Sequence, residues 1–438
     1  MSTAINKSAK ISIVIFSTIS FTLLFAAWLM FGVLAIPIQK EFQLTEIEFG
    51  WLTSIAILNG ALWRLFFGII ADKYGGKKIF IIIMIISTIF CFLISNVSSF
   101  SHLLIYAFFL GISGNSFSVG IAWNSAWFEK KEQGFALGIF GAGNVGASVT
   151  KIIGPTLIVA IPAVGLFNGL IPGGWRFIPF LYGIFLIICT LFLLVFTPNN
   201  DITPAKGRSF LNTLKPLKEI RVWRFSLYYI IVFGAYVALS VWLPKYYVDN
   251  YKLDLKIAAL LTALFIFPAS LLRPLGGKLS DYFGPRKVMY FVFGVMLLCL
   301  LFLAAPQGHI VLYLSEKYHP VGQVNVMKFT IGVVPFTILI FIIGVCMGIG
   351  KAAVYKYIPE YFPNDVGSVG GLVGCIGALG GFFLPIAFSY SLNYSAIPQT
   401  CFMILFLITL ISFLWMHFTI MKMSADAAPH IKKFIELP

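Results

Sequence analysis

The chain has 438 residues, of which 59% are hydrophobic and only 11% are charged, and its mean hydropathy is +0.94. These values exclude an ordinary soluble protein, in which about 25% of residues are charged, and they indicate a polytopic membrane protein. The net charge of +15 does not indicate nucleic-acid binding, because most of the Lys and Arg residues fall on one side of the expected membrane topology.

Twelve apolar segments are each long enough to cross a bilayer as a helix, which takes about 20 residues. They cover residues 12–38, 47–71, 78–97, 101–127, 134–160, 174–197, 223–247, 256–280, 286–305, 329–358, 366–392 and 396–422. The first segment is too long for a cleavable signal and lacks a small-residue cleavage site, so we expect it to be the first span.

The segments between the spans are short and hydrophilic, apart from 198–222 and 306–328. The first of these divides the chain into six spans and six spans. The sequence therefore predicts an all-α membrane protein with twelve transmembrane helices in two six-helix parallel pseudo-repeats. The expected parts are an N-terminal bundle at 1–197, a cytoplasmic linker at 198–222 and a C-terminal bundle at 223–438.

Both halves carry the same motif around an arginine that lies inside an apolar span. Arg64 and Arg273 are each followed by the pattern Gly-x-x-x-Asp-x-x-Gly-x-basic-basic, in which the aspartates are Asp72 and Asp281. Charged residues inside a bilayer are costly and usually mark function. Each aspartate lies about 12 Å along its helix from its arginine, because the helix rises about 1.5 Å per residue, so it cannot neutralise the arginine directly.

Four cations lie well inside the expected spans, Arg64, Lys151, Arg273 and Lys351, whereas every Asp and Glu falls at a span end or in a loop. A cavity with cations and no carboxylates predicts an anionic ligand. The guanidinium fork suits flat oxyanions, and lysine is a point charge that can lose its proton. A structural alternative stays open for each cation, because an arginine can extend to the interface and a lysine can bond to backbone carbonyls or water.

Two glycine-rich rows, 138–155 and 370–385, occupy matching positions before a closing proline. Small residues allow close helix packing, or they expose backbone to a small ligand. Asn144 is the polar exception in the first row, and its amide must find partners in backbone, water or substrate.

At this point the chain resembles the major facilitator superfamily, through the Gly-x-x-x-Asp motifs and the two parallel six-span repeats. The paired glycine rows and the arginine in each of spans 2 and 8 resemble the nitrate/nitrite porter family, and the resemblance covers essentially the whole chain. It implies that Arg64 and Arg273 bind nitrate or nitrite near the membrane midplane. It also implies contributions to the substrate site from Asn144, Phe117, Tyr229, Phe233, Gly141, Gly143 and Gly374.

The segments around Arg221 and Lys351 resemble the branch of that family associated with proton-coupled nitrate uptake. We therefore expect a secondary active transporter that carries nitrate, and nitrite as a further substrate, together with protons by alternating access. Lys351 and Lys151 are candidates for proton coupling, and Asp72 and Asp281 for gate latches between the bundles.

Alternatives remain open at this stage: a nitrate/nitrite antiporter, a carrier of small organic anions, or a transporter-like anion sensor. We expect no enzyme activity, cofactor or metal, because no nucleophile–base pair or metal-ligand spacing is evident, and the six cysteines lie apart within spans. The expected partners are the inorganic anion, protons and the lipid bilayer, with no nucleic acid. The expected protein is a monomer in the bacterial cytoplasmic (inner) membrane with both termini in the cytoplasm.

Overall fold

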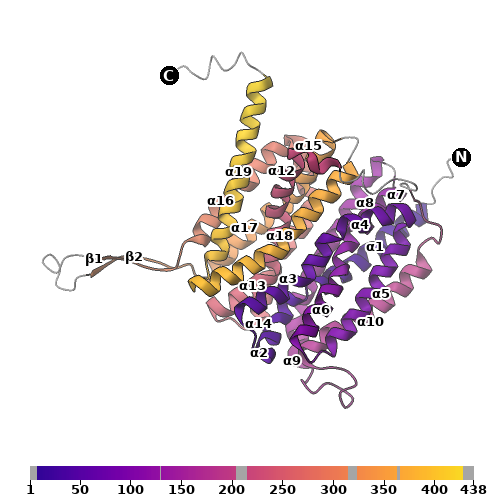
Figure 1. The fold of residues 1–438 in the computed structure, drawn as a ribbon, viewed down its shortest axis with the longest axis horizontal. Helices are drawn as coiled ribbons and strands as arrows, with labels where there is room; N and C mark the ends of the chain where they lie inside the picture. The colour runs from indigo at the N-terminus through magenta and orange to yellow at the C-terminus, as the bar shows by residue number, and fades with distance from the viewer. Residues whose placement is uncertain (1–6, 129, 204–214, 314–322, 363–365, 428–438) are drawn as a thin grey trace.

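The computed structural model describes residues 7–128, 130–203, 215–313, 323–362 and 366–427, and nearly all of them are helical (Figure 1). A bilayer provides no water for unpaired backbone groups, so an apolar chain of this kind satisfies them within helices. In the described residues, ten helical segments are long and apolar enough to cross a membrane. Two further pairs of helices, each bent at a short break, bring the number to twelve if each pair is counted as one span. The twelve predicted spans are confirmed in this sense.

The described part of the first half is mostly helical and includes three short 3-10 turns. Its helical segments are α1 (Lys7–Trp28), α2 (Phe31–Phe42), α3 (Glu46–Leu62), α4 (Arg64–Tyr74), α5 (Gly76–Ser95), α6 (Phe100–Leu110), η1 (Gly111–Asn115), α7 (Ser116–Trp127), α8 (Lys130–Ala142), η2 (Gly143–Val145), α9 (Gly146–Ala160), η3 (Gly174–Arg176) and α10 (Phe177–Phe196). We refer to these helices as the N-terminal bundle.

The second half repeats this arrangement, with a π-helical turn in its first span. Its helical segments are η4 (Lys215–Lys218), α12 (Ile220–Tyr229), η5 (Ile230–Gly234), α13 (Ala235–Tyr251), α14 (Leu255–Leu271), α15 (Arg273–Phe283), α16 (Pro285–Ala304), α17 (Val333–Tyr361), α18 (Val366–Ser395) and α19 (Thr400–Ala427). We refer to α12–α19 as the C-terminal bundle. The predicted linker falls between α10 and α12, with 204–214 outside the described residues.

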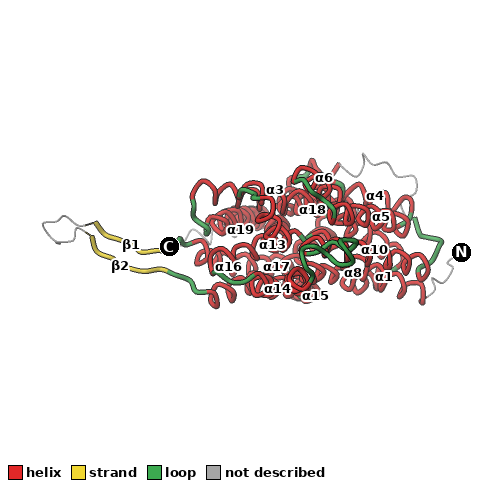
Figure 2. Tube along the Cα trace, turned by 90° about the horizontal axis from the view of Figure 1, so that it is seen from below, coloured by secondary structure: helices red, strands yellow, loops and turns green. Residues whose placement is uncertain are grey.

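The chain between α16 and α17 forms an antiparallel hairpin, β1 (Gly308–Tyr313) and β2 (Gln323–Phe329), which projects away from the helices (Figures 1 and 2). Gly308 pairs with Phe329, and the register shifts between Ile310 and Val311. The sequence predicts only a long hydrophilic connection at 306–328, so the two strands are an addition to the predicted all-helical fold.

The two helix breaks in the bent pairs fall at the two arginines. Arg64 begins α4 after a 40° bend from α3, and Arg273 begins α15 after a 44° bend from α14. Pro274 follows Arg273 near the start of α15, where proline is tolerated because its missing N–H would be unpaired anyway. Each arginine therefore lies at the bend within its span, and the two bends occupy equivalent positions in the two halves.

The two bundles meet along α3 and α18 and along α9 and α14. Figure 1 shows the start of α1 and the end of α19 towards one end of the molecule and α2 and α9 at the other. We call the end at α2 the far face. Close contact there requires a glycine: a Cβ at Gly50 would lie 2.2 Å from the hydroxyl oxygen of Ser389 in the other bundle.

Candidate anion site between the bundles

Arg64 is 1% exposed and lies where α4 meets the C-terminal bundle. Its Nη1 donates to the carbonyl of Gly374 at 3.4 Å, and its Nη2 donates to the carbonyl of Gly114 at 3.3 Å. Its Nε is buried without a hydrogen-bond partner among the described residues. These contacts orient the guanidinium plane without neutralising its charge, because both acceptors are uncharged carbonyls.

Phe117 brings the two arginines into one site. Its ring centroid lies 5.5 Å from the guanidinium carbon of Arg64 and 5.3 Å from that of Arg273. An aromatic face attracts a cation at this distance. Nη1 of Arg273 is buried and has no hydrogen-bond partner among the described residues. The structure thus brings together two cations that lie in different bundles, and each retains an N–H group for a further acceptor.

Phe233 and Tyr229 form an aromatic wall on the side of the C-terminal bundle. The Phe233 ring lies 5.2 Å from the Arg64 guanidinium carbon. Tyr229 stacks on Phe233 with centroids 5.1 Å apart and an interplanar angle of 13°, and its hydroxyl is buried without a partner among the described residues. Together with Phe117, these rings surround the arginines with weakly polar surface.

Asn144 is 0% exposed, and neither its Nδ2 nor its Oδ1 has a hydrogen-bond partner in the described structure. A buried amide without partners costs stability, so a role in binding would account for Asn144 at this position. An anion that accepts a hydrogen bond from Nδ2 would give the amide such a role.

The three glycines of the predicted site differ in their surroundings. A Cβ at Gly141 would meet only Arg273, at 3.7 Å, and a Cβ at Gly374 would lie 2.8 Å from the Tyr355 hydroxyl and 3.8 Å from Cδ of Arg64. Gly141 and Gly374 therefore face the arginines. Gly143 differs, because its Cβ would lie 2.5 Å from the Phe21 ring, and its small size serves packing against α1.

Lys351 is 0% exposed and lies next to the aromatic wall. Its Nζ donates to the carbonyl of Ala269 at 2.9 Å and lies 3.2 Å from the centroid of the Tyr236 ring. Tyr236 in turn bonds to the Ser270 hydroxyl at 2.9 Å and donates to the backbone carbonyl of Asn144 at 3.5 Å. Tyr236 therefore connects the lysine of one bundle with the asparagine of the other.

Lys151 has a different environment, although it is equally buried. Its Nζ donates to the carbonyl of Leu29 at 3.2 Å, which lies at the break between α1 and α2. This contact fits the structural alternative, in which the lysine satisfies a carbonyl at a helix break.

The two motif aspartates lie away from the arginines. Asp281 forms an ion pair with Lys356 of α17, within the same bundle. Asp72 lies in the last turns of α4 and also makes an interaction. A latch role between the bundles stays a prediction for both.

Three aromatic residues of this region were not predicted from the sequence. Trp28 lies 5.7 Å from the Arg64 guanidinium carbon, and Tyr355 lies 5.5 Å from that of Arg273. Tyr355 also contacts Tyr229 edge to face at 5.0 Å and donates to the Gly370 carbonyl at 3.1 Å. Tyr236 is the third. Sequence offers no signal for them, because aromatic residues in membrane helices usually serve packing.

The electrostatics of the site favour a small anion. Among the residues whose burial is described, the buried polar side chains include Arg64, Lys151 and Lys351 but no Asp or Glu, and Arg273 is partly buried. Charge-assisted hydrogen bonds from guanidinium groups are strong and can be bidentate. A flat oxyanion would accept such bonds in its plane while the rings cover its faces.

Residues 16–315 match the family model of the Major Facilitator Superfamily. The chain is 61% identical over 421 residues to the probable nitrate/nitrite antiporter NarK1 of Thermus thermophilus, which covers 96% of this chain and 94% of that protein. It is 31% identical over 398 residues to the nitrite extrusion protein of Bacillus subtilis (strain 168), covering 90% and 91% of the two chains.

Among solved structures, the fold is similar to that of a bacterial homolog of the human lysosomal transporter Spinster. The TM-score is 0.68 at 17% identity, and the match covers 94% of this chain and 97% of that one. The chain belongs to the Major Facilitator Superfamily, within the group that contains these nitrate and nitrite transporters.

Proposed function

We propose that this protein is a secondary active transporter of nitrate, with nitrite as a further substrate, and that the anion binds between Arg64 and Arg273. The observation that carries the proposal is the position of both guanidinium groups beside the single Phe117 ring, 5.5 and 5.3 Å away. Each retains a buried N–H group without a partner among the described residues. The names of the relatives, a nitrate/nitrite antiporter and a nitrite extrusion protein, support the choice of anion.

Alternating access follows from the charge of the empty site. Two cations from different bundles repel each other, and this repulsion opposes closure of the bundles around an empty site. A bound monovalent anion offsets part of the repulsion, so the loaded protein closes more readily than the empty one. A ligand shifts such an equilibrium only by its difference in affinity between the two states, and here the anion supplies that difference.

Uptake of an anion into a negative-inside cell requires an energy source. The membrane potential opposes it by about 2.3 kcal/mol per charge per 100 mV. We propose that more than one proton enters with each nitrate and that Lys351 carries one of them. Lysine can release its proton, unlike arginine, and an arriving anion brings the counter-charge that a buried ammonium lacks. The contacts of Tyr236 with Lys351 and with the Asn144 carbonyl provide a route for this coupling.

Exchange of nitrate for internal nitrite is the second candidate, because the Thermus thermophilus relative is described as a probable nitrate/nitrite antiporter. Exchange needs no proton carrier, since one anion leaves as another enters. In that case Lys351 would serve as a fixed positive charge beside the site.

Reconstituted vesicles distinguish the two mechanisms. Under symport, a proton gradient directed into the vesicles, with the membrane potential clamped at zero, drives nitrate accumulation without internal nitrite. Lys351→Ala abolishes this accumulation but retains the exchange of external for internal nitrate. Lys151→Ala is the matched comparison, because Lys151 bonds at a helix break away from the aromatic wall. Strict dependence on internal nitrite, with no response to the pH gradient, would rule out symport.

We further propose that the protein resides in a bacterial cytoplasmic membrane with both termini in the cytoplasm and acts as a monomer. The concentration of Lys and Arg residues on the side of the termini supports this orientation. The two six-helix bundles would then rock about the arginine pair, and the far face would open to the outside.

A further inference from the structure

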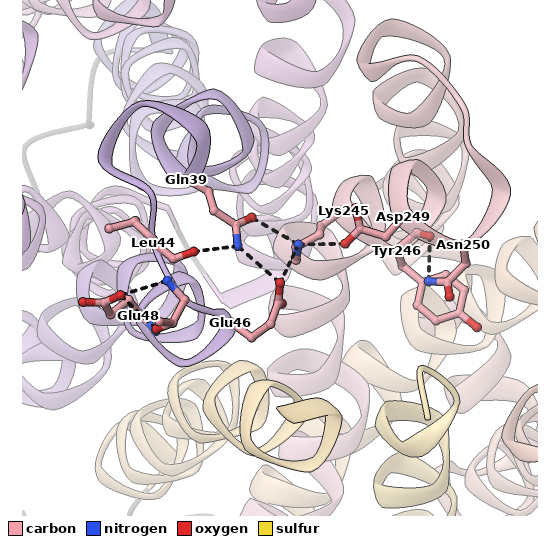
Figure 3. A network of polar contacts seen from close by, with 9 residues as sticks. Gln39, Leu44, Glu46, Glu48, Lys245, Tyr246, Asp249 and Asn250 are labelled. Atoms are coloured by element: carbon pink, nitrogen blue, oxygen red, sulfur yellow. Dashed lines mark hydrogen bonds and ion pairs between the residues drawn. The ribbon is translucent and has the colours of Figure 1, made fainter. Parts of the chain in front are cut away.

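The far face carries a polar network that joins the two bundles and centres on Lys245 of α13 (Figure 3). Lys245 is 7% exposed. Its Nζ lies 3.1 Å from Oε1 of Glu46, 2.7 Å from Oδ2 of Asp249 and 3.1 Å from Oε1 of Gln39. We call Lys245, Glu46, Asp249 and Gln39 the far-face latch.

The partners of Lys245 come from both sides of the boundary between the bundles. Glu46 begins α3 and Gln39 lies in α2, so both belong to the N-terminal bundle. Asp249 lies one turn beyond Lys245 on α13 itself. The amide of Gln39 also donates to Oε1 of Glu46 at 3.3 Å. Lys245 and Glu46 therefore each have a partner in their own bundle as well as one across the boundary.

The position of Glu46 is fixed by the local sequence. Thr45 caps α3 in a capping box with Glu48, in which each side chain bonds to the backbone of the other residue. A capped helix start is rigid compared with a free end. The carboxylate of Glu46 is thereby presented to Lys245 from a fixed helix terminus.

The latch lies over the aromatic contact between the bundles. Trp242, one turn before Lys245, meets Phe49 edge to face with centroids 6.1 Å apart, and Nζ of Lys245 lies 5.0 Å from the Phe49 ring. A cavity of about 420 Å³ beside the latch is lined by Lys245, Glu46, Asp249 and Trp242, among others. Opening of the far face must separate both the aromatic contact and the latch.

We propose that the latch holds the far face closed and that Asp249 makes it reversible by receiving Lys245 when the bundles separate. On opening, Lys245 loses Glu46 and Gln39 but keeps Asp249, and Glu46 keeps the amide of Gln39. Neither charge is left without a partner. This matters because removal of one partner from a buried charge is far more costly than exchange between partners. The role holds whichever anion is carried.

The proposal predicts opposite effects of removing the charge from each of the two carboxylates that bind Lys245. Glu46→Gln removes the attraction that exists only in the closed state, so it favours opening of the far face. Asp249→Asn removes the partner that Lys245 keeps in the open state, so it disfavours opening. A purely structural ion-pair cluster would respond in the same direction to either change.

Ser389 offers a reporter of opening. It is 0% exposed, its hydroxyl has no hydrogen-bond partner among the described residues, and it faces Gly50 across the bundle boundary. Ser389→Cys in a background with the six native cysteines replaced should react with a membrane-impermeant maleimide only when the far face opens. The reaction rate then follows the open population, even where that population is small.

In full-length protein in oriented proteoliposomes, we expect Glu46→Gln to raise this rate about three- to tenfold and Asp249→Asn to lower it by a similar factor, as for a pair of moderate strength. Glu41→Gln is the matched control, because Glu41 pairs with Arg176 of the same bundle on the same face, and it should leave the rate unchanged. Changes in the same direction in the two latch variants, or no change in either, would overturn the proposal. Equal elution of all variants in size-exclusion chromatography excludes misfolding as the cause of a shift.

Discussion

Arg64 and Arg273 each keep a guanidinium nitrogen without a hydrogen-bond partner in the described structure, Nε in the first and Nη1 in the second. Buried donors of this kind usually have partners. The backbone carbonyls of Gly374 and Gly114 hold Arg64 in place, yet they leave its charge uncompensated. An anion between the two residues would complete their hydrogen bonding and compensate their charge.

A substitution of Asn144 tests whether its side chain binds the anion. Its side-chain amide has no partner among the described residues, so Asn144→Ala should not lower the thermal stability of the empty protein. The same change should weaken nitrate binding about tenfold, because a hydrogen bond to a charged group contributes about 1.5–3 kcal/mol. Thermal unfolding in detergent, with and without nitrate, measures both quantities. A loss of stability without a loss of nitrate-dependent stabilisation would assign Asn144 a structural role.

The sequence could predict the arginine pair because duplication places the two residues at matching positions among apolar residues. It could not distinguish the two buried lysines, whose difference arises from tertiary contacts: Lys151 with a carbonyl at a helix break, and Lys351 with the Tyr236 ring. The sequence does not mark Lys245 as a site residue, because it lies near the end of the expected span 223–247, where lysines commonly extend to the interface.

At the scale of elements, the breaks in the two bent spans position the repeated arginines at the candidate binding site. Arg64 and Arg273 each begin the second segment of a bent span. The repeated motif predicted equivalent positions in the two halves but not the bends, because no proline lies between α3 and α4. The glycine rows predicted close packing, and only the structure separates glycines that contact a neighbouring helix from those that face the site.

The two kinds of glycine should respond differently to a methyl group. A Cβ at Gly146 would lie 2.0 Å from the backbone oxygen of Thr22, whereas a Cβ at Gly141 would meet only Arg273 at 3.7 Å. Gly146→Ala should therefore destabilise the protein by about 1–3 kcal/mol, the usual cost of overpacking, because α1 and α9 must move apart. Gly141→Ala should preserve stability. Thermal unfolding of the two variants measures the difference, and equal midpoints would contradict this assignment.

On the scale of the whole molecule, the twelve spans were predictable because long apolar runs have few alternatives to membrane helices. The hairpin β1–β2 was not, because short strands in a hydrophilic connection lack a strong periodic signal. The contact between the bundles also escaped prediction, since pairings such as Gly50 with Ser389 depend on residues far apart in the chain. This contact determines which charges meet, and thus both the anion site and the far-face latch.

The central claim is that two guanidinium forks, one from each bundle, bind the transported anion. Nitrate uptake by the purified protein in proteoliposomes tests it directly, with Arg64→Lys and Arg273→Lys measured beside the unchanged protein. Lysine keeps the charge but cannot present the planar fork, so each variant should lose at least about tenfold in uptake at low nitrate, as for the loss of one charge-assisted hydrogen bond. Near-normal nitrate uptake in either variant would contradict the account.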